Sequence, residues 1–158
     1  MVQLQAGGFA MALASDIRLA AESARFNTAF IHVGLSACDV GVSYFLPRMI
    51  GLSRAAEYMF TGRFIDARTA ERLGLVSRVV PDDKLDATAL ELAEEILRNS
   101  PLGVRMTKEV LSMNVDATCL ESAVHMENRT QVLCTFTEDC KEAASAFLEK
   151  RKPGFKDR

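Results

Sequence analysis

The fold of this chain is decided by the stretch Ala6-Gly7-Gly8-Phe9-Ala10-Met11-Ala12-Leu13-Ala14-Ser15-Asp16. Two glycines open a run of alanine, leucine and methionine, which predicts a helix over residues 8–15 that Asp16 ends. Glycines at a helix start leave backbone N–H groups open to a ligand, and the partial positive charge there stabilises a developing oxyanion. Taken alone, however, two glycines are better explained as a plain helix entry.

The loop from Val33 to Gly41 is the second informative stretch, because it contains a single acidic residue, Asp39. Gly34 permits a positive φ, so a loop is expected from there to about residue 40. The local sequence leaves two interpretations of Asp39 open. It is either a general acid/base or the N-cap of the helix that follows.

Three other polar features of the chain have structural explanations that need no catalytic role. Cys38 is expected to be a small buried thiol, since no base that would activate it is evident. His32 is expected to be hydrogen-bonded at a loop edge. The basic run Lys150-Arg151-Lys152 fits either phosphate binding or a solvated helix end.

Length and composition limit the class of protein. A chain of 158 residues with 49% apolar and 25% charged residues is typical of one soluble globular domain. A net charge of −2 argues against nucleic acid as the main partner, and no apolar run approaches the roughly twenty residues of a membrane span. Four cysteines without CxxC spacing argue against a metal site, and the absence of a recognisable signal peptide predicts reduced thiols and a cytoplasmic location.

The remaining elements follow from local patterns. Short strands are expected near residues 16–20, 25–28 and 75–80, and helices near residues 42–49, 54–60, 66–73 and from 85 onward. The expected helix starts are Ser53, Asp66, Ser100 with Pro101, a Thr118–Glu121 capping box, and Thr137. The helices after residue 85 are expected to pack their apolar faces against a neighbouring subunit or the main core. In the last helix this face is made of Cys140, Ala143, Ala144, Phe147 and Leu148.

Ordered motifs along the whole chain resemble the crotonase (enoyl-CoA hydratase/isomerase) superfamily. They are Ala6 to Ala20, Ser23-Ala24-Arg25-Phe26, Val33-Gly34-Leu35, Gly41 to Gly51, Thr61-Gly62-Arg63, Ala67 to Ala70, Gly74-Leu75-Val76, Val79-Val80-Pro81, Ser100-Pro101, Lys108 and Ser145 to Arg151. The resemblance implies an α/β fold in which residues 1–82 form part of a ββα superhelical core and residues 83–158 form a helical trimerisation region.

The same resemblance implies an enzyme that acts on an acyl-CoA thioester and assembles as a homotrimer or a dimer of trimers. Coenzyme A would enter as part of the substrate, and neither a separate cofactor nor a metal is implied. Gly7 matches one of two backbone donors that hold the thioester oxygen; the other belongs to an upstream segment that this chain is expected to lack. Gly8, Phe30, Leu35 and Lys150 are the expected substrate-binding residues.

Departures from the family pattern bear on the reaction. The two glutamates that perform hydration correspond to Ala10 and Phe30, which cannot transfer a proton. Asp39 matches the position where isomerases and a dehalogenase branch carry an acidic residue. Double-bond isomerisation is the predicted reaction, and a nucleophilic carboxylate, as in the dehalogenases, is the alternative. The rival hypothesis is a non-catalytic or truncated homologue that binds acyl-CoA or partner subunits. In a chain without the preceding half of the core, apolar surface near Phe26, Phe30 and Ile31 is expected to be exposed.

Overall fold

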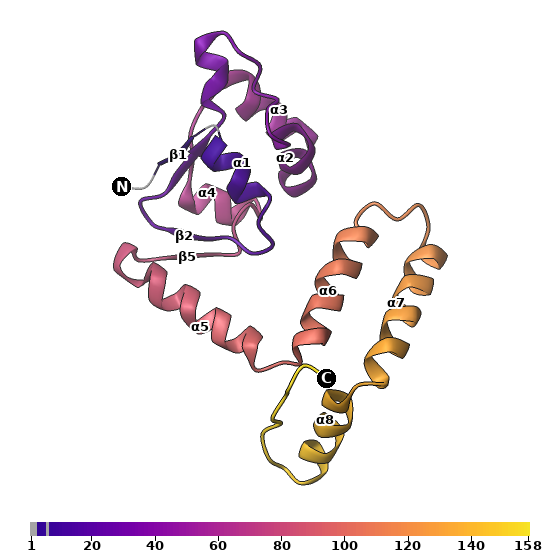
Figure 1. Cartoon of the computed structure of the whole chain (residues 1–158). Coiled ribbons are helices and arrows are strands. Elements are labelled where there is room, and N and C mark those ends of the chain that lie inside the picture. The colour runs from indigo at the N-terminus through magenta and orange to yellow at the C-terminus, as the bar shows by residue number, and fades with distance from the viewer. Residues whose placement is uncertain (1–2, 6) are drawn as a thin grey trace. The chain divides into compact units, whose positions relative to one another are not determined.

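A computed structural model describes residues 3–5 and 7–158 of the chain; Met1, Val2 and Ala6 of the glycine stretch lie outside the described residues. The chain divides into two compact units, one ending at Ala89 and one running from Leu90 to Arg158 (Figure 1). The roles predicted for residues 1–82 and 83–158, spiral core and oligomerisation region, stay predictions. In the described part of the chain, no helix is both long enough and apolar enough to cross a bilayer.

The first unit contains two small sheets. In one, β3 (Arg25–Asn27) lies between β1 (Gln3–Gln5), which is parallel to it, and β4 (Ile65–Asp66), which is antiparallel. In the other, β2 (Leu19–Ala21) pairs in parallel with β5 (Arg78–Val80). The strand predicted for residues 75–80 is shorter than expected, because the N–H of Leu75 donates to the carbonyl of Ala70 and so closes the preceding helix.

Four α-helices and one 3-10 helix lie between β1 and β5 in the first unit. They are α1 (Gly7–Leu13), η1 (Ala29–Val33), α2 (Val42–Ile50), α3 (Leu52–Thr61) and α4 (Ala67–Arg72), and Figure 1 shows α2 beside α3. The predicted N-cap at Asp66 is confirmed, since its carboxylate accepts from the N–H of Thr69. Ser53 as an N-cap is wrong: Gly51 both ends α2 and caps α3, so Ser53 already lies in the first turn.

The core of the first unit is centred on α1 and β3. Phe9 and Phe26 pack ring to ring with centroids 5.7 Å apart, and both are buried. The expectation that Phe26 is exposed is wrong, because β3 is the middle strand of its sheet rather than an edge. Phe30 and Ile31, which follow β3, are half-buried.

After η2 (Asp82–Lys84), α5 (Leu85–Leu97) links the units in sequence, and none of its residues is fully buried. The second unit contains α6 (Pro101–Asn114), α7 (Leu120–Thr135) and α8 (Glu138–Leu148), with α6 beside α7 (Figure 1). Pro101 and the Thr137 cap lie as predicted. The Thr118–Glu121 capping box is wrong, since Cys119 occupies the N-cap position and makes no side-chain cap bond.

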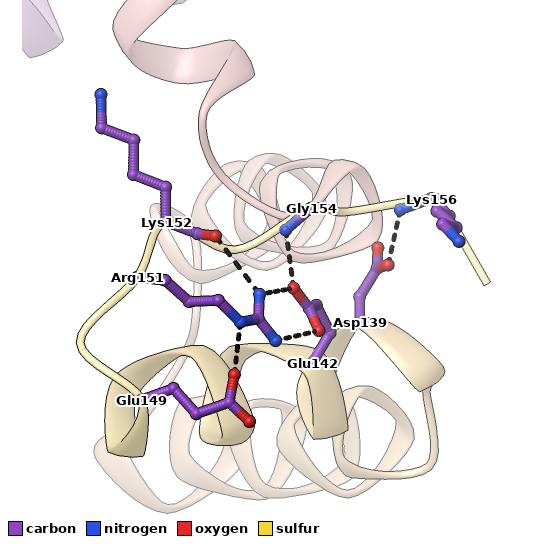
Figure 2. Close-up of polar contacts among 7 residues, drawn as sticks. All are labelled: Asp139, Glu142, Glu149, Arg151, Lys152, Gly154 and Lys156. Atoms are coloured by element: carbon purple, nitrogen blue, oxygen red, sulfur yellow. Dashed lines mark hydrogen bonds and ion pairs between the residues drawn. The ribbon is translucent and has the colours of Figure 1, made fainter.

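The C-terminal tail, residues 151–158, folds back on α8 through buried and exposed carboxylates (Figure 2). Asp139, only 2% exposed, accepts from the backbone N–H groups of Lys156 and Asp157. In the single chain, Phe147 and Leu148 of the predicted apolar face are exposed, whereas Asp139 and Ala146 of α8 are buried. Packing of the predicted face against a neighbouring subunit stays a prediction. A sequence pattern of apolar residues does not reveal that a polar tail occupies the other side.

Candidate active site

Two helix starts meet the same edge of the first sheet. β1 and β3 are parallel and in register, with Gln5 opposite Asn27, so both strands present their carboxyl ends at one edge. From that edge the chain enters α1 at Gly7 and η1 at Ala29. Ligands of parallel sheets commonly bind at such carboxyl ends. The predicted site residues Gly7, Gly8 and Phe30 are thus brought to one side of the sheet.

Gly7 is open where a ligand would need to approach. A Cβ built on Gly7 meets no heavy atom within 4 Å, whereas one on Gly8 lies 3.5 Å from Cδ2 of Leu4. Neither residue has the positive φ that would require glycine for the turn itself. The N–H groups of a first helical turn have no acceptor within the helix. The backbone at Gly7 can therefore offer a hydrogen-bond donor to an incoming oxygen.

The loop after η1 connects two predicted substrate-binding residues. The N–H of Leu35 donates to the carbonyl oxygen of Phe30 at 3.1 Å, and Gly34 adopts the left-handed conformation that this turn needs, with φ 79°. Leu35 is 58% exposed and Phe30 is half-buried. The turn therefore presents apolar surface beside the sheet edge.

Asp39 is exposed and does not cap α2. Its main-chain carbonyl accepts from the N–H of Val42 at 2.9 Å, while Gly41 is the N-cap residue, so the capping interpretation is wrong. In this loop the side chain of Ala37 is buried, whereas the side chain of Cys38 next to it is exposed. The prediction of a buried thiol is wrong for this reason.

The backbone directly after Asp39 is strained. Val40 has φ 44°, in the left-handed region that β-branched residues avoid, and Gly41 follows with φ 86°. A Cβ on Gly41 would lie 3.0 Å from the ring of Phe45, so this turn is fixed against α2. Strained backbone persists only where the surroundings impose it, and such positions cluster at functional sites.

The positions of the expected glutamates carry no ionisable group. Ala10 is 2% exposed within the core, and Phe30 lies in η1. The His32 prediction is confirmed: its Nε2 lies 3.1 Å from the carbonyl oxygen of Thr61, at the surface. In residues 3–5 and 7–158, no three histidine, cysteine, aspartate or glutamate side chains are grouped to hold a metal ion.

Lys150 belongs to the second unit and lies just beyond α8, in the left-handed conformation with φ 53°. The neighbouring Arg151 forms ion pairs with Glu142 and Glu149 (Figure 2). The side chain of Lys150 is exposed. Its role toward coenzyme A stays a prediction.

Sequence reasoning missed the pair Asn27 and Thr28. Both are 3% exposed, and their side-chain oxygens have no hydrogen-bond partner among the described residues. The available signal was two polar residues directly after the apolar strand residue Phe26.

Comparison with known proteins identifies the family. Residues 3–158 match the sequence pattern described as enoyl-CoA hydratase/isomerase. A Mycobacterium tuberculosis protein named "Probable enoyl-CoA hydratase EchA12" is 44% identical over 152 residues, which make up 96% of this chain and 53% of that protein. The short-chain-enoyl-CoA hydratase of Clostridium acetobutylicum is 36% identical over 153 residues and 58% of its own length.

Solved structures agree with the sequence relatives. The enoyl-CoA hydratase of Bacillus anthracis superposes with a TM-score of 0.94 at 37% identity, over 99% of this chain and 60% of that one. An enoyl-CoA hydratase/isomerase structure from Mycobacterium abscessus gives a TM-score of 0.91 at 41% identity. The chain spans about half the length of the curated relatives that it matches, 53% in the first comparison. This sequence therefore belongs to the enoyl-CoA hydratase/isomerase family and folds as part of a crotonase-type α/β structure.

Proposed function

We propose that the protein acts on an acyl-CoA thioester and stabilises an enolate of that thioester. The observation that carries the proposal is the open backbone at Gly7, on the sheet edge that also leads to Phe30. A backbone N–H aimed at the thioester oxygen stabilises negative charge as it develops. Coenzyme A enters as part of the substrate, and the chemistry needs no further cofactor.

We propose Asp39 as the group that moves the proton. Its carboxylate would take a proton from the α-carbon and return it at the γ-carbon, while the oxyanion donors hold the enolate. The exposed carboxylate on a strained loop supports this role. The apolar residues Ala10 and Phe30 favour double-bond migration over water addition, which requires two carboxylates in this family.

Further parts of the proposal concern binding and assembly. Gly8, Phe30 and Leu35 would contact the acyl group, and Lys150 would meet the phosphates of coenzyme A. A homotrimer would cover apolar side chains of the second unit, including Phe136, Phe147 and Leu148, which are all more than three-quarters exposed. Aromatic and aliphatic surface of this kind is typical of subunit interfaces.

A second candidate function is acyl-CoA binding without turnover, which the apolar residues at both glutamate positions favour. The test is a turnover screen on the protein expressed from its complete reading frame, with 2-enoyl-CoA and 3-enoyl-CoA substrates and identification of the products. Double-bond migration supports the isomerase proposal. Formation of 3-hydroxyacyl-CoA would replace it with hydration, and tight binding without product would establish the second candidate.

A further inference from the structure

Two buried oxygen atoms at the end of β3 have no partner. Oδ1 of Asn27 and Oγ1 of Thr28 make no hydrogen bond to any of the described residues, although both side chains are 3% exposed. Leaving a buried polar atom unsatisfied is costly, so such atoms are rare in folded proteins. Two of them in consecutive residues indicate that a group other than the described residues pairs with them.

The Asn27 side chain is held in one orientation. Its Nδ2 donates to the carbonyl oxygen of Gly62 at 3.2 Å, at the end of α3. This bond fixes the carboxamide and leaves Oδ1 as a positioned acceptor. A partner of Oδ1 must therefore carry an N–H or O–H donor.

Thr28 is a donor as well as an acceptor, and it leaves the extended conformation. Its φ of −99° and ψ of 64° end the strand, so the strict alternation of side chains along β3 does not extend to it. Its hydroxyl can donate to an oxygen that in turn donates to Asn27. A single hydroxyl group within hydrogen-bond distance of both oxygens would satisfy both residues, because it accepts one hydrogen bond and donates another.

The pair also lies at the sheet edge where the substrate is proposed to bind. Asn27 is opposite Gln5 at the carboxyl end of the parallel strands, and the chain continues from Gln5 to Gly7 and from Thr28 to Phe30. Buried polar groups that are positioned in advance give strong discrimination, because a ligand without the matching group leaves them unpaired.

We propose that Asn27 and Thr28 recognise a hydroxyl group on or beside the acyl chain of the ligand. The proposal rests on the acyl-CoA function proposed above and adds a specificity to it. The hydroxyl belongs either to the acyl chain or to a bound water, and ligands that differ by one hydroxyl distinguish these sources.

The test compares equilibrium binding of butyryl-CoA and of both enantiomers of 3-hydroxybutyryl-CoA by the protein expressed from its complete reading frame. Thr28→Val removes the hydroxyl at nearly constant volume, whereas Thr28→Ser keeps the hydroxyl and removes the methyl group. Thr107→Val is the control, since the Thr107 hydroxyl is exposed and donates to its own helix at the carbonyl of Gly103. Loss of one hydrogen bond corresponds to a roughly three- to tenfold change in the dissociation constant.

If the hydroxyl is on the acyl chain, Thr28→Val weakens binding of one hydroxyacyl enantiomer by that factor, leaves butyryl-CoA unchanged, and is rescued by Thr28→Ser. If it is a water, Thr28→Val weakens all three ligands equally and Thr28→Ser again restores them. In the first case the melting temperature of the unliganded variant stays the same or rises, because an unsatisfied buried group is removed. A lower melting temperature with unchanged affinities would overturn the proposal and assign the pair to internal packing. Absence of binding by every acyl-CoA would overturn the proposed function and this inference together, whereas retained turnover in Asp39→Asn leaves the inference intact.

Discussion

The N–H of Leu35 donates to the carbonyl oxygen of Phe30 at 3.1 Å, and this bond closes η1 into the loop that carries Asp39. The apolar contact surface and the proposed acid/base therefore belong to one continuous segment, residues 29–41. What holds this segment on the core determines how well the site is formed. Its closest support is the end of α3 at Gly62, which packs against Ile31 and His32.

Replacing Gly62 with alanine is expected to destabilise the first unit. Its φ is 62°, and a Cβ there would lie 2.7 Å from Cγ2 of Ile31 and would also clash with the ring of His32. The left-handed conformation costs a non-glycine residue about 1–2 kcal/mol, and overpacking adds about 1–3 kcal/mol. Gly74→Ala is the matched control, because Gly74 has φ 75° but open space around it. Urea unfolding should show a clearly larger loss in the free energy of unfolding for Gly62→Ala than for Gly74→Ala. Equal losses in the two variants would mean that the contact of Gly62 with η1 does not contribute to stability.

The Asp66 cap is expected to make stability depend on pH in the acid range. The Thr69 N–H, which donates to the carboxylate at 2.8 Å, lowers the pKa of Asp66 below its usual value. A carboxyl with a depressed pKa in the folded state adds stability above its unfolded pKa of about 3.9 and loses it as the pH falls through the folded value. Asp66→Ala should therefore cost about 0.5–2 kcal/mol at pH 7 and progressively less as the pH falls below the unfolded pKa of about 3.9. The control is Asp83→Ala, an exposed aspartate; an Asp66 effect that is constant with pH would contradict the charged-cap explanation.

Local signals account for the parts of the fold that the sequence predicted. Asp66 and Thr137 cap their helices with their own side chains, and Pro101 begins α6, so neighbouring residues are enough to place them. Ser53 and Thr118 have the same cap-forming chemistry but fail, because Gly51 and Cys119 take the cap positions. Competition between adjacent candidates is decided by the path of the incoming chain, which local sequence does not contain.

The site was predictable only where it matches family motifs. Gly7, Phe30 and Leu35 belong to family motifs and lie in one unit, at or near one sheet edge. The position of the unpaired Asn27 and Thr28 at that edge depends on the pairing of β1 with β3, whose residues are far apart in sequence. Likewise, burial of Phe26 follows from the strand order, and burial of Asp139 follows from the returning tail. Long-range pairing of this kind leaves no periodic trace in the sequence.

The C-terminal tail is expected to detach when Glu142 loses its charge. The Arg151 guanidinium, which contacts this carboxylate at 2.5 and 2.9 Å, and the N–H of Gly154 lower the pKa of Glu142 to about 2 (Figure 2). Its contribution to tail binding is therefore full at neutral pH and is lost only as the pH falls toward about 2. In Glu142→Gln, the amide hydrogen of Gly154 should exchange faster at pH 7. The exposed Glu109→Gln is the control. Unchanged exchange at Gly154 in Glu142→Gln would show that the other contacts of the tail, at Asp139 and between Arg105 and Asp157, are enough to hold it.

The most direct measurement of the central claim is the turnover of Asp39→Asn in the protein expressed from its complete reading frame. The substitution is nearly isosteric, and the Asp39 side chain caps no helix, so the fold and acyl-CoA affinity should be unchanged. Removing a positioned acid/base lowers the rate by about a hundredfold to ten-thousandfold. Asp83→Asn serves as the matched surface control. The account predicts that Asp39→Asn binds acyl-CoA normally while double-bond migration and exchange of deuterium at the α-carbon fall by that factor; wild-type rates of migration and exchange would contradict it.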